Sequence, residues 1–194
     1  YRNFNEMIGQ MQMLDRQKAV EHWKAKGLDF SKLFHKPETS EPEAHFHSVR
    51  QNHKIAEVLD RKLIEEAQNA IKDHTKVRIE TKINNTDRTT GAMLSVRIAK
   101  LYGHGVLPDE TIHVHATGTA VQSFGAWLAH GVTFDLEGEA NDYVGKGLSG
   151  GRIIIYPPAN SPVVAEDSII AGNTVLYGAI AGECYIRGVA GERF

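Results

Sequence analysis

Histidines are the first residues whose spacing could support chemistry. His113 and His115 alternate within a β-type run, so their imidazoles would share one face of a strand. His45 and His47 show the same spacing around Phe46. Two histidines at this spacing can bind one metal ion, but a third ligand is needed and none occurs at a recognisable spacing. The sequence therefore predicts no metal site.

Acidic residues form a second candidate group. Asp135, Glu137 and Glu139 also alternate, as carboxylates do on the outer face of β-helix enzymes that degrade polysaccharides. Paired carboxylates act as acid and base when their surroundings separate their pKa values. We interpret these residues as a solvated strand face. A free-standing β-helix carbohydrate-active enzyme is the alternative.

A glycine-rich stretch, residues 145–151 (Gly-Lys-Gly-Leu-Ser-Gly-Gly), is similar to a phosphate-binding loop. Such a loop follows a strand and opens a helix, whose N-terminus meets the phosphate. Here an isoleucine-rich run over residues 152–156 follows instead, and carboxylates just upstream would repel an anion. We interpret these glycines as sharp corners of the chain and predict no cofactor-binding residue.

Two side chains remain as potential nucleophiles. Cys184 is the one cysteine of the chain, which excludes an internal disulfide framework and a cysteine-only zinc or iron–sulfur site. No histidine is near it in the sequence, and we expect an inert, mostly buried thiol. Ser123, within Gln-Ser-Phe-Gly, lacks the first glycine of a nucleophile elbow. The sequence therefore predicts no catalytic residue.

Composition places these residues in a globular protein. The chain has 194 residues, of which 41% are hydrophobic and 24% charged, and its formal net charge is -2. This charge gives no reason to expect nucleic acid as a partner, and no apolar run approaches the ~20 residues of a membrane helix. The chain does not begin with Met and stops abruptly, so we expect a piece of a longer, cytoplasmic polypeptide.

The first half has a helical composition. Only Gly9 and Gly27 lie in residues 1–90, although the chain has 18 glycines, and glycine is unfavourable inside helices. We predict helices over residues 5–14, 17–26 and 60–73, and an exposed linker over residues 36–44. An alternating strand is predicted over residues 76–83, followed by a turn and a helix over residues 91–102.

The second half repeats. β-Type runs start near Thr111, Val132, Arg152 and Asn173, with another near Glu192, in steps of about 20 residues. No helix-length segment separates most of them, which favours a parallel β-helix with glycines of positive φ at its corners. The side chains expected to point inward are Ile112, Val114, Val132, Phe134 and Leu136. Three consecutive isoleucines leave the phase of residues 152–156 open.

Several long strings resemble one family, the C-terminal GXGXG domain of the glutamate synthase large subunit. They span residues 118–127, 136–151, 170–179 and 190–194, and shorter matches occur at residues 83–92 and 3–9. The sequence departs from the family pattern at Val121, Thr174 and Ile180, which affects packing only.

The resemblance implies a mainly β fold, a right-handed parallel β-helix (single-stranded solenoid) preceded by an α-helical or mixed N-terminal segment. Such enzymes convert L-glutamine and 2-oxoglutarate into two L-glutamates. An amidotransferase domain releases ammonia, which a tunnel carries to a synthase barrel with FMN and a 3Fe-4S cluster. The resemblance makes this chain a structural scaffold with no catalytic, cofactor or metal residue. Its structural motif glycines would be Gly131, Gly145, Gly147, Gly150, Gly151, Gly172, Gly178 and Gly191.

The resemblance also implies a division of the chain and a set of partners. Residues 1–38 would be a helical tail of a preceding flavin domain, residues 39–110 a linker and entry segment, and residues 111–194 the first coils of a β-helix that is truncated at its C-terminus. Partners would be the other domains of the large subunit and a small electron-transfer subunit, and the open end could self-associate. The electron source, NADPH, NADH or ferredoxin, stays open. So does a separate β-helix interaction subunit of an oxidoreductase complex.

Overall fold

The computed structural model describes residues 1–194 except 16–20, 39–46, 48 and 104–106. The described residues form two compact units, Tyr1–His53 and Lys54–Phe194. The first residues of the predicted helix 17–26, most of the predicted linker 36–44, and His45 lie outside the described residues.

The first unit contains two short 3-10 helices, η1 (Phe4–Glu6) and η2 (Met11–Met13). The helix predicted over residues 5–14 is therefore wrong. Gly9 lies between the two elements with φ +74°, a left-handed conformation that ends a helix. Met13 and Leu14 are exposed, so no packed apolar face holds a longer helix together.

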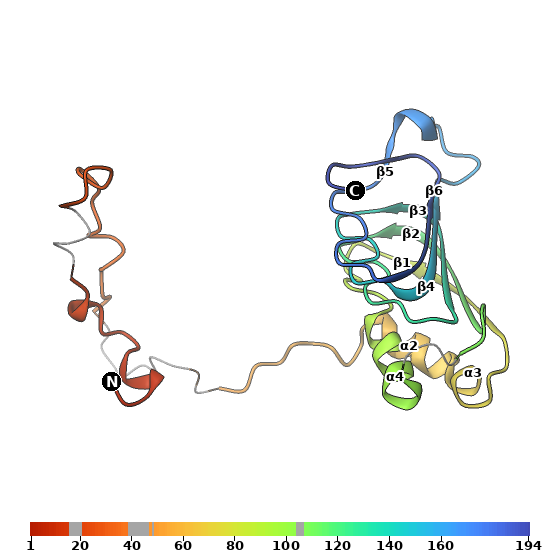
Figure 1. Cartoon of the computed structure of the whole chain (residues 1–194), viewed down its shortest axis with the longest axis horizontal. Helices are drawn as coiled ribbons and strands as arrows, with labels where there is room; N and C mark the ends of the chain where they lie inside the picture. Colours follow the sequence, from red (N-terminus) through yellow and green to blue (C-terminus); the bar gives the residue numbers. More distant parts are fainter. Residues whose placement is uncertain (16–20, 39–46, 48, 104–106) are drawn as a thin grey trace. The chain divides into compact units, whose positions relative to one another are not determined.

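The second unit is built on a seven-stranded sheet in which every strand pair is parallel (Figure 1). The main strand order is β1-β2-β3-β4-β6, while β5 pairs with β3 and β7. The strands are β1 (Val77–Ile83), β2 (Ile112–Ala120), β3 (Val132–Ala140), β4 (Ser149–Tyr156), β5 (Ile169–Ala171), β6 (Ala181–Ile186) and β7 (Val189–Ala190). With its few helices, the chain has an α/β architecture, and the predicted parallel strands are confirmed.

Side chains alternate across the sheet as the sequence predicts. One ladder of inward residues runs through Ile79, Val114, Phe134 and Ile153, each paired with the next across neighbouring strands. All four are buried, which confirms the inward residues named for β2 and β3. The same register shows which residues of β4 point inward. Ile153 and Ile155 are fully buried, whereas Ile154 is not.

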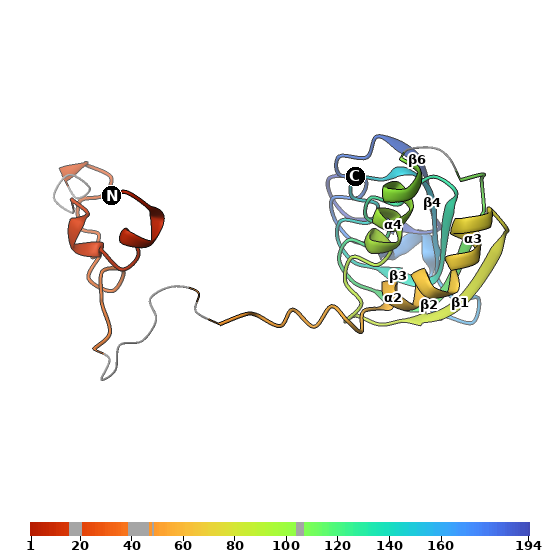
Figure 2. The same cartoon turned by 90° about the horizontal axis from the view of Figure 1, so that it is seen from below.

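Three helices pack beside the sheet: α2 (Leu59–Glu66), α3 (Gln68–Asp73) and α4 (Ala92–Tyr102) (Figure 2). The helix predicted over residues 60–73 is present but breaks into α2 and α3 at Ala67, where ψ is 0°. The helix predicted over residues 91–102 is confirmed as α4. Among the described residues, no helix has the length and apolarity to cross a membrane.

The strands expected near Asn173 and Glu192 are absent from the described residues. Residues 173–178 form a turn, in which Thr174 and Leu176 have φ +59°. Arg193 also has a positive φ, +58°, and β7 ends before it. Left-handed residues cannot continue an extended strand. The run near Asn173 is therefore a turn that resembles a strand in composition, and no strand forms near Glu192.

Candidate functional site

Three of the predicted corner glycines, Gly145, Gly147 and Gly178, belong to a set of three stacked turns, which we call the turn stack (residues 123–127, 143–147 and 174–178). In each turn every second residue has a positive φ, between +54° and +68°. The residues concerned are Ser123, Gly125, Trp127, Tyr143, Gly145, Gly147, Thr174, Leu176 and Gly178. The pattern repeats at the same three positions of each turn, so corresponding residues of successive turns lie in register.

Backbone hydrogen bonds hold the turn stack together. Ser123 N–H donates to the carbonyl of Asp142 (2.9 Å), and Tyr143 N–H donates to that of Asn173 (2.9 Å). Further along, Gly147 N–H donates to the carbonyl of Tyr177 (2.8 Å). These N–H groups already have backbone partners and cannot cradle a phosphate. The corner interpretation of residues 145–151 is thereby supported over a phosphate loop.

The predicted structural glycines fall into two groups. Gly131, Gly145, Gly147, Gly150 and Gly178 have positive φ as expected. Gly151, Gly172 and Gly191 do not, so the positive φ expected of these corners is wrong. Their requirement for glycine is steric, because a Cβ atom would lie 2.7 Å from Leu128 Cγ at Gly151 and 2.4 Å from Asp142 Oδ1 at Gly172. At Gly191 it would lie 2.7 Å from Asn173 Oδ1.

Two glycines that the sequence analysis missed are the most restricted of all. Gly118 and Gly138 are paired in the β2–β3 register and have φ +132° and +159°. A Cβ atom would lie 2.2 Å from the Ile83 carbonyl oxygen at Gly118, and 1.8 Å from the Gly118 carbonyl oxygen at Gly138. Their spacing matches the sequence repeat of about 20 residues, which was the available signal.

Four of the histidines and carboxylates of the sequence analysis, His113, His115, Asp135 and Glu137, come together on the outer face of the sheet. His113 Nε2 lies 3.4 Å and His115 Nδ1 lies 3.3 Å from Asp135 Oδ2. Glu80 and Glu137 each place a carboxylate oxygen 3.9 Å from His115 Nε2. The His115 and Asp135 side chains are only 17% and 15% exposed. The expectation of a solvated face is therefore wrong for Asp135.

Two polar atoms in this histidine–carboxylate cluster (Glu80, His113, His115, Asp135 and Glu137) are buried without a hydrogen-bond partner among the described residues: His115 Nδ1 and Asp135 Oδ1. The pKa of neighbouring Tyr156 is raised to about 12, mainly by burial and in addition by the adjacent Asp135 carboxylate. The phenol therefore stays protonated at neutral pH. Within the described residues, no group of three His, Cys, Asp or Glu side chains could hold a metal ion.

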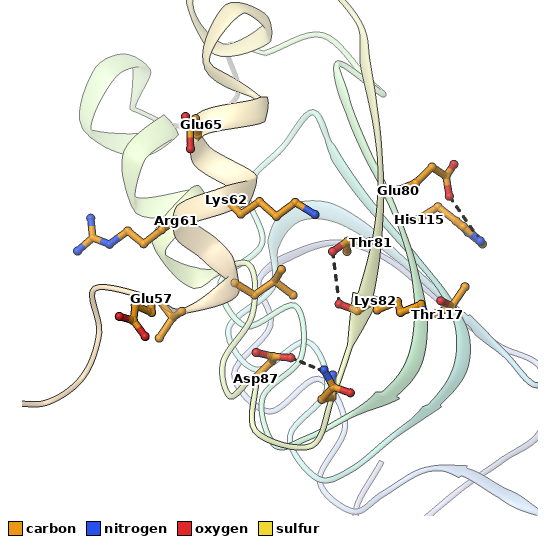
Figure 3. A pocket seen from close by; sticks show the side chains of 13 residues that line it. Glu57, Arg61, Lys62, Glu65, Glu80, Thr81, Lys82, Asp87, His115 and Thr117 are labelled. Carbon is orange, nitrogen blue, oxygen red and sulfur yellow. Dashed lines mark hydrogen bonds and ion pairs between the residues drawn. The ribbon is translucent and has the colours of Figure 1, made fainter.

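An open groove of about 890 Å³ adjoins this cluster between α2 and the first two strands (Figure 3). Figure 3 shows Glu80 and His115 pointing toward each other from β1 and β2, while Lys62 extends from α2 toward β1. The groove is also lined by the carboxylates Glu57, Glu65 and Asp87 and by the cations Arg61 and Lys82. Its charges are mixed, so it has no net preference for an anion or a cation.

The two potential nucleophiles are not activated. Burial raises the pKa of Cys184 to about 11, so the thiolate is scarce at neutral pH. Ser123 belongs to the turn stack, and no hydrogen bond joins its hydroxyl to a histidine in the described part of the chain. His45, outside the described residues, cannot be compared with His47. The strongest geometric constraints thus lie at Gly118 and Gly138 in the strands and at the positive-φ residues of the turn stack, where they act on folding.

Comparisons with known proteins identify the family of this chain. A family model described as "GXGXG motif" matches residues 60–194. The chain is 48% identical to Glutamate synthase [NADH] of Schizosaccharomyces pombe and 45% identical to Glutamate synthase [NADPH] large chain of Bacillus subtilis. It is 39% identical to Ferredoxin-dependent glutamate synthase 2 of Synechocystis. Each match covers 100% of this chain, but only 9%, 13% and 12% of these relatives.

Proposed function

We propose that this chain, which belongs to the GXGXG motif family, is a structural domain of a glutamate synthase large subunit, where it supports the amidotransferase and FMN synthase domains. The whole enzyme would form two L-glutamates from L-glutamine and 2-oxoglutarate in nitrogen assimilation. One observation carries the proposal beyond the family match. Three of the glycines named as the family motif, Gly145, Gly147 and Gly178, lie in the turn stack, and the N–H groups of Gly145 and Gly147 bond to backbone carbonyls of neighbouring turns rather than facing a ligand site.

The fold that we propose for this domain is a right-handed parallel β-helix. Each coil would consist of one strand of the main sheet, one turn of the turn stack and the segment that returns to the next strand. The equal register of β1, β2 and β3 and the register of the turns support this arrangement. The eight glycines named from the sequence would then be structural, together with Gly118 and Gly138.

The division of the chain follows the same proposal. Residues 1–38 would continue a preceding flavin domain, residues 39–110 would link to and enter the β-helix, and residues 111–194 would be its first coils. FMN and the 3Fe-4S cluster would be bound elsewhere in the cytoplasmic enzyme. NADH, NADPH and ferredoxin all occur in the names of the relatives, and the donor would be selected outside this chain, by a small subunit or by ferredoxin itself.

The proposal is tested by separating chemistry from folding in the large subunit that contains this chain. The variants His115→Ala, Asp135→Asn and Cys184→Ala should keep glutamate formation within twofold of the unchanged enzyme. Gly138→Ala should lose FMN, glutaminase activity and glutamate formation together, because a folding defect acts on all of them. The isolated 194-residue chain should retain no flavin through gel filtration.

A different result would identify a catalytic role. If Asp135→Asn or His115→Ala lowered kcat more than tenfold with FMN content and thermal stability unchanged, the structural proposal would be overturned. Cleavage of polygalacturonate by the isolated chain, lost on Asp135→Asn, would instead support the carbohydrate-active alternative.

A further inference from the structure

A second groove, which we call the helical groove, is bordered by helices of the second unit and by one residue of the turn stack. It has a volume of about 960 Å³ and lies among α2, α3, α4 and Trp127. The inner faces of these helices bury Leu63, Leu94 and Ile98. The groove is formed mainly by other residues of these helices, although the buried core residue Ile71 also lines it.

The floor of the helical groove is apolar and exposed. Val96 is 50% exposed, Leu101 48% and Trp127 48%. Partly buried Ile64 and Met93 extend the same surface. Scattered apolar side chains are ordinary on a surface, whereas a contiguous apolar patch inside a groove marks a binding surface.

The charged side chains around this floor are mostly positive. Arg61, Lys72, Arg97 and Lys100 line the groove, and Glu65 is the one carboxylate among its lining residues. No ion pair neutralises Lys72, Arg97 or Lys100 within the described residues. An occupant that covers the floor would therefore have to bring carboxylates of its own.

Trp127 provides a second, independent reason to regard the helical groove as a binding surface. It occupies a position of the turn stack that is glycine in the next two turns, and its φ is +54°. A bulky residue in this conformation is strained and persists only where the surrounding structure holds it. The ring covers Gly147 and has Lys146 Nζ 5.7 Å from its centroid, yet about half of it stays exposed at the groove. Tryptophan and arginine are the side chains that most often anchor protein interfaces.

We propose that the helical groove receives an acidic amphipathic helix from a part of the glutamate synthase large subunit outside these 194 residues. This inference rests on the proposed function. A groove between helices accepts a helix by its apolar side chains at i, i+3, i+4 and i+7. Carboxylates beside that apolar stripe would pair with Arg97, Lys100 and Lys72, and Trp127 would pack against the stripe. Most of the length of the relatives lies outside the matched region, so such a segment has room to exist.

The test is lysine reactivity in the holoenzyme. Acetylation rates of Lys72 and Lys100 are measured by mass spectrometry in the large subunit and in the isolated 194-residue chain. We expect both lysines to react at least tenfold more slowly in the large subunit. Carbodiimide coupling should then join Lys72 or Lys100 to an Asp or Glu of a helix outside residues 1–194 of the same polypeptide.

Charge reversal supplies the matched control. Arg97→Glu should restore the acetylation rate of Lys72 and Lys100 in the large subunit. Reversal of an exposed cation outside the groove, Lys76→Glu, should leave their protection unchanged.

Two outcomes overturn the inference: equal lysine reactivity in the two proteins, and cross-links that lead to a second copy of residues 1–194. Neither depends on the rate of glutamate formation. A failure of the groove inference is thus distinguishable from a failure of the proposed function, which is read from the His115 and Asp135 variants.

Discussion

Asp60 in α2 accepts a hydrogen bond from the backbone N–H of Gly91, which immediately precedes α4, at 2.7 Å. The same carboxylate accepts from the N–H groups of Met93 (2.6 Å) and Leu94 (3.3 Å). Three N–H groups that a helix start leaves without intrahelical partners are thus satisfied by a side chain from another helix. The carboxylate also lies at the positive end of the α4 dipole. Asp60 therefore joins α2 and α4, two of the three helices that border the helical groove.

Removal of this carboxylate should destabilise the protein. Burial raises the pKa of Asp60, while the N–H groups of Gly91, Met93 and Leu94 act in the opposite direction. We expect Asp60→Ala to lower the free energy of unfolding by about 2–3 kcal/mol, because buried N–H groups lose their partner. Asp60→Asn keeps one acceptor oxygen, so its free energy of unfolding should lie between those of the unchanged chain and Asp60→Ala. Urea unfolding measures both, with exposed Asp73→Ala as the control, and an equal loss for Asp73→Ala would contradict the capping role.

The two paired strand glycines should be more sensitive than a glycine of the turn stack. Gly138→Ala places a Cβ atom 1.8 Å from a backbone oxygen, which only a shift of β2 or β3 could relieve. In Gly178→Ala the new Cβ atom would have no other atom within 4 Å. The only destabilisation comes from placing alanine at a φ of +68°, which costs about 1 kcal/mol. Thermal unfolding followed by circular dichroism compares the two. If Gly138→Ala and Gly178→Ala had similar melting temperatures, β2 and β3 would be able to accommodate a side chain at Gly138 without loss of stability.

Trp127→Gly should be well tolerated in the isolated chain. Glycine relieves the left-handed strain, which offsets the loss of the ring contacts with Gly147 and Lys146. We expect a free energy of unfolding within about 1 kcal/mol of the unchanged chain. Phe124→Ala in the same turn, which removes a fully buried ring, should cost about 3–5 kcal/mol. Trp127→Gly that destabilised as much as Phe124→Ala would assign the tryptophan to the core instead of an interface.

Stability should fall in alkaline solution because of Cys184. Its folded-state pKa, about 11, is raised above the ordinary value of 9.0 by burial. The unfolded chain therefore loses this proton first, and the contribution to stability is complete below pH 9 and disappears as the pH rises through 11. Between pH 8 and 11 the loss should be about 2 kcal/mol. Urea midpoints of Cys184→Ala should show a correspondingly weaker pH dependence, and unchanged dependence would contradict the buried thiol.

The C-terminal strands should promote association. β6 pairs only with β4 among the described strands, and Ile180 and Tyr185 are exposed on it or next to it. An edge strand with free N–H and C=O groups pairs readily with another chain. Sedimentation should show concentration-dependent association, and amides of residues 180–194 should exchange faster than those of β3. A monomer at high concentration with equally protected amides would contradict the open edge.

Much of the fold could be predicted because its signals are local. The alternation of Val77, Ile79 and Ile83 with charged residues predicts β1. The stretch of apolar residues closed by Gly103 likewise predicts α4. The strand predicted near Asn173 is wrong because it rests on local composition alone. The apolar side chains of residues 173–177 match a strand, whereas their conformation depends on the turn stacked beside them.

The sequence by itself determined the parallel strands, the inward faces of β2 and β3, and the family resemblance, since each depends on the order and type of neighbouring residues. Only the tertiary structure decided that Asp60 caps α4, that His115 and Asp135 share a half-buried cluster, and that Gly118 and Gly138 cannot carry a side chain. These relationships join residues from different strands or helices. The strand relationships arise because neighbouring strands stack about 4.8 Å apart, and the capping of α4 arises because two helices pack together; no single segment specifies either contact.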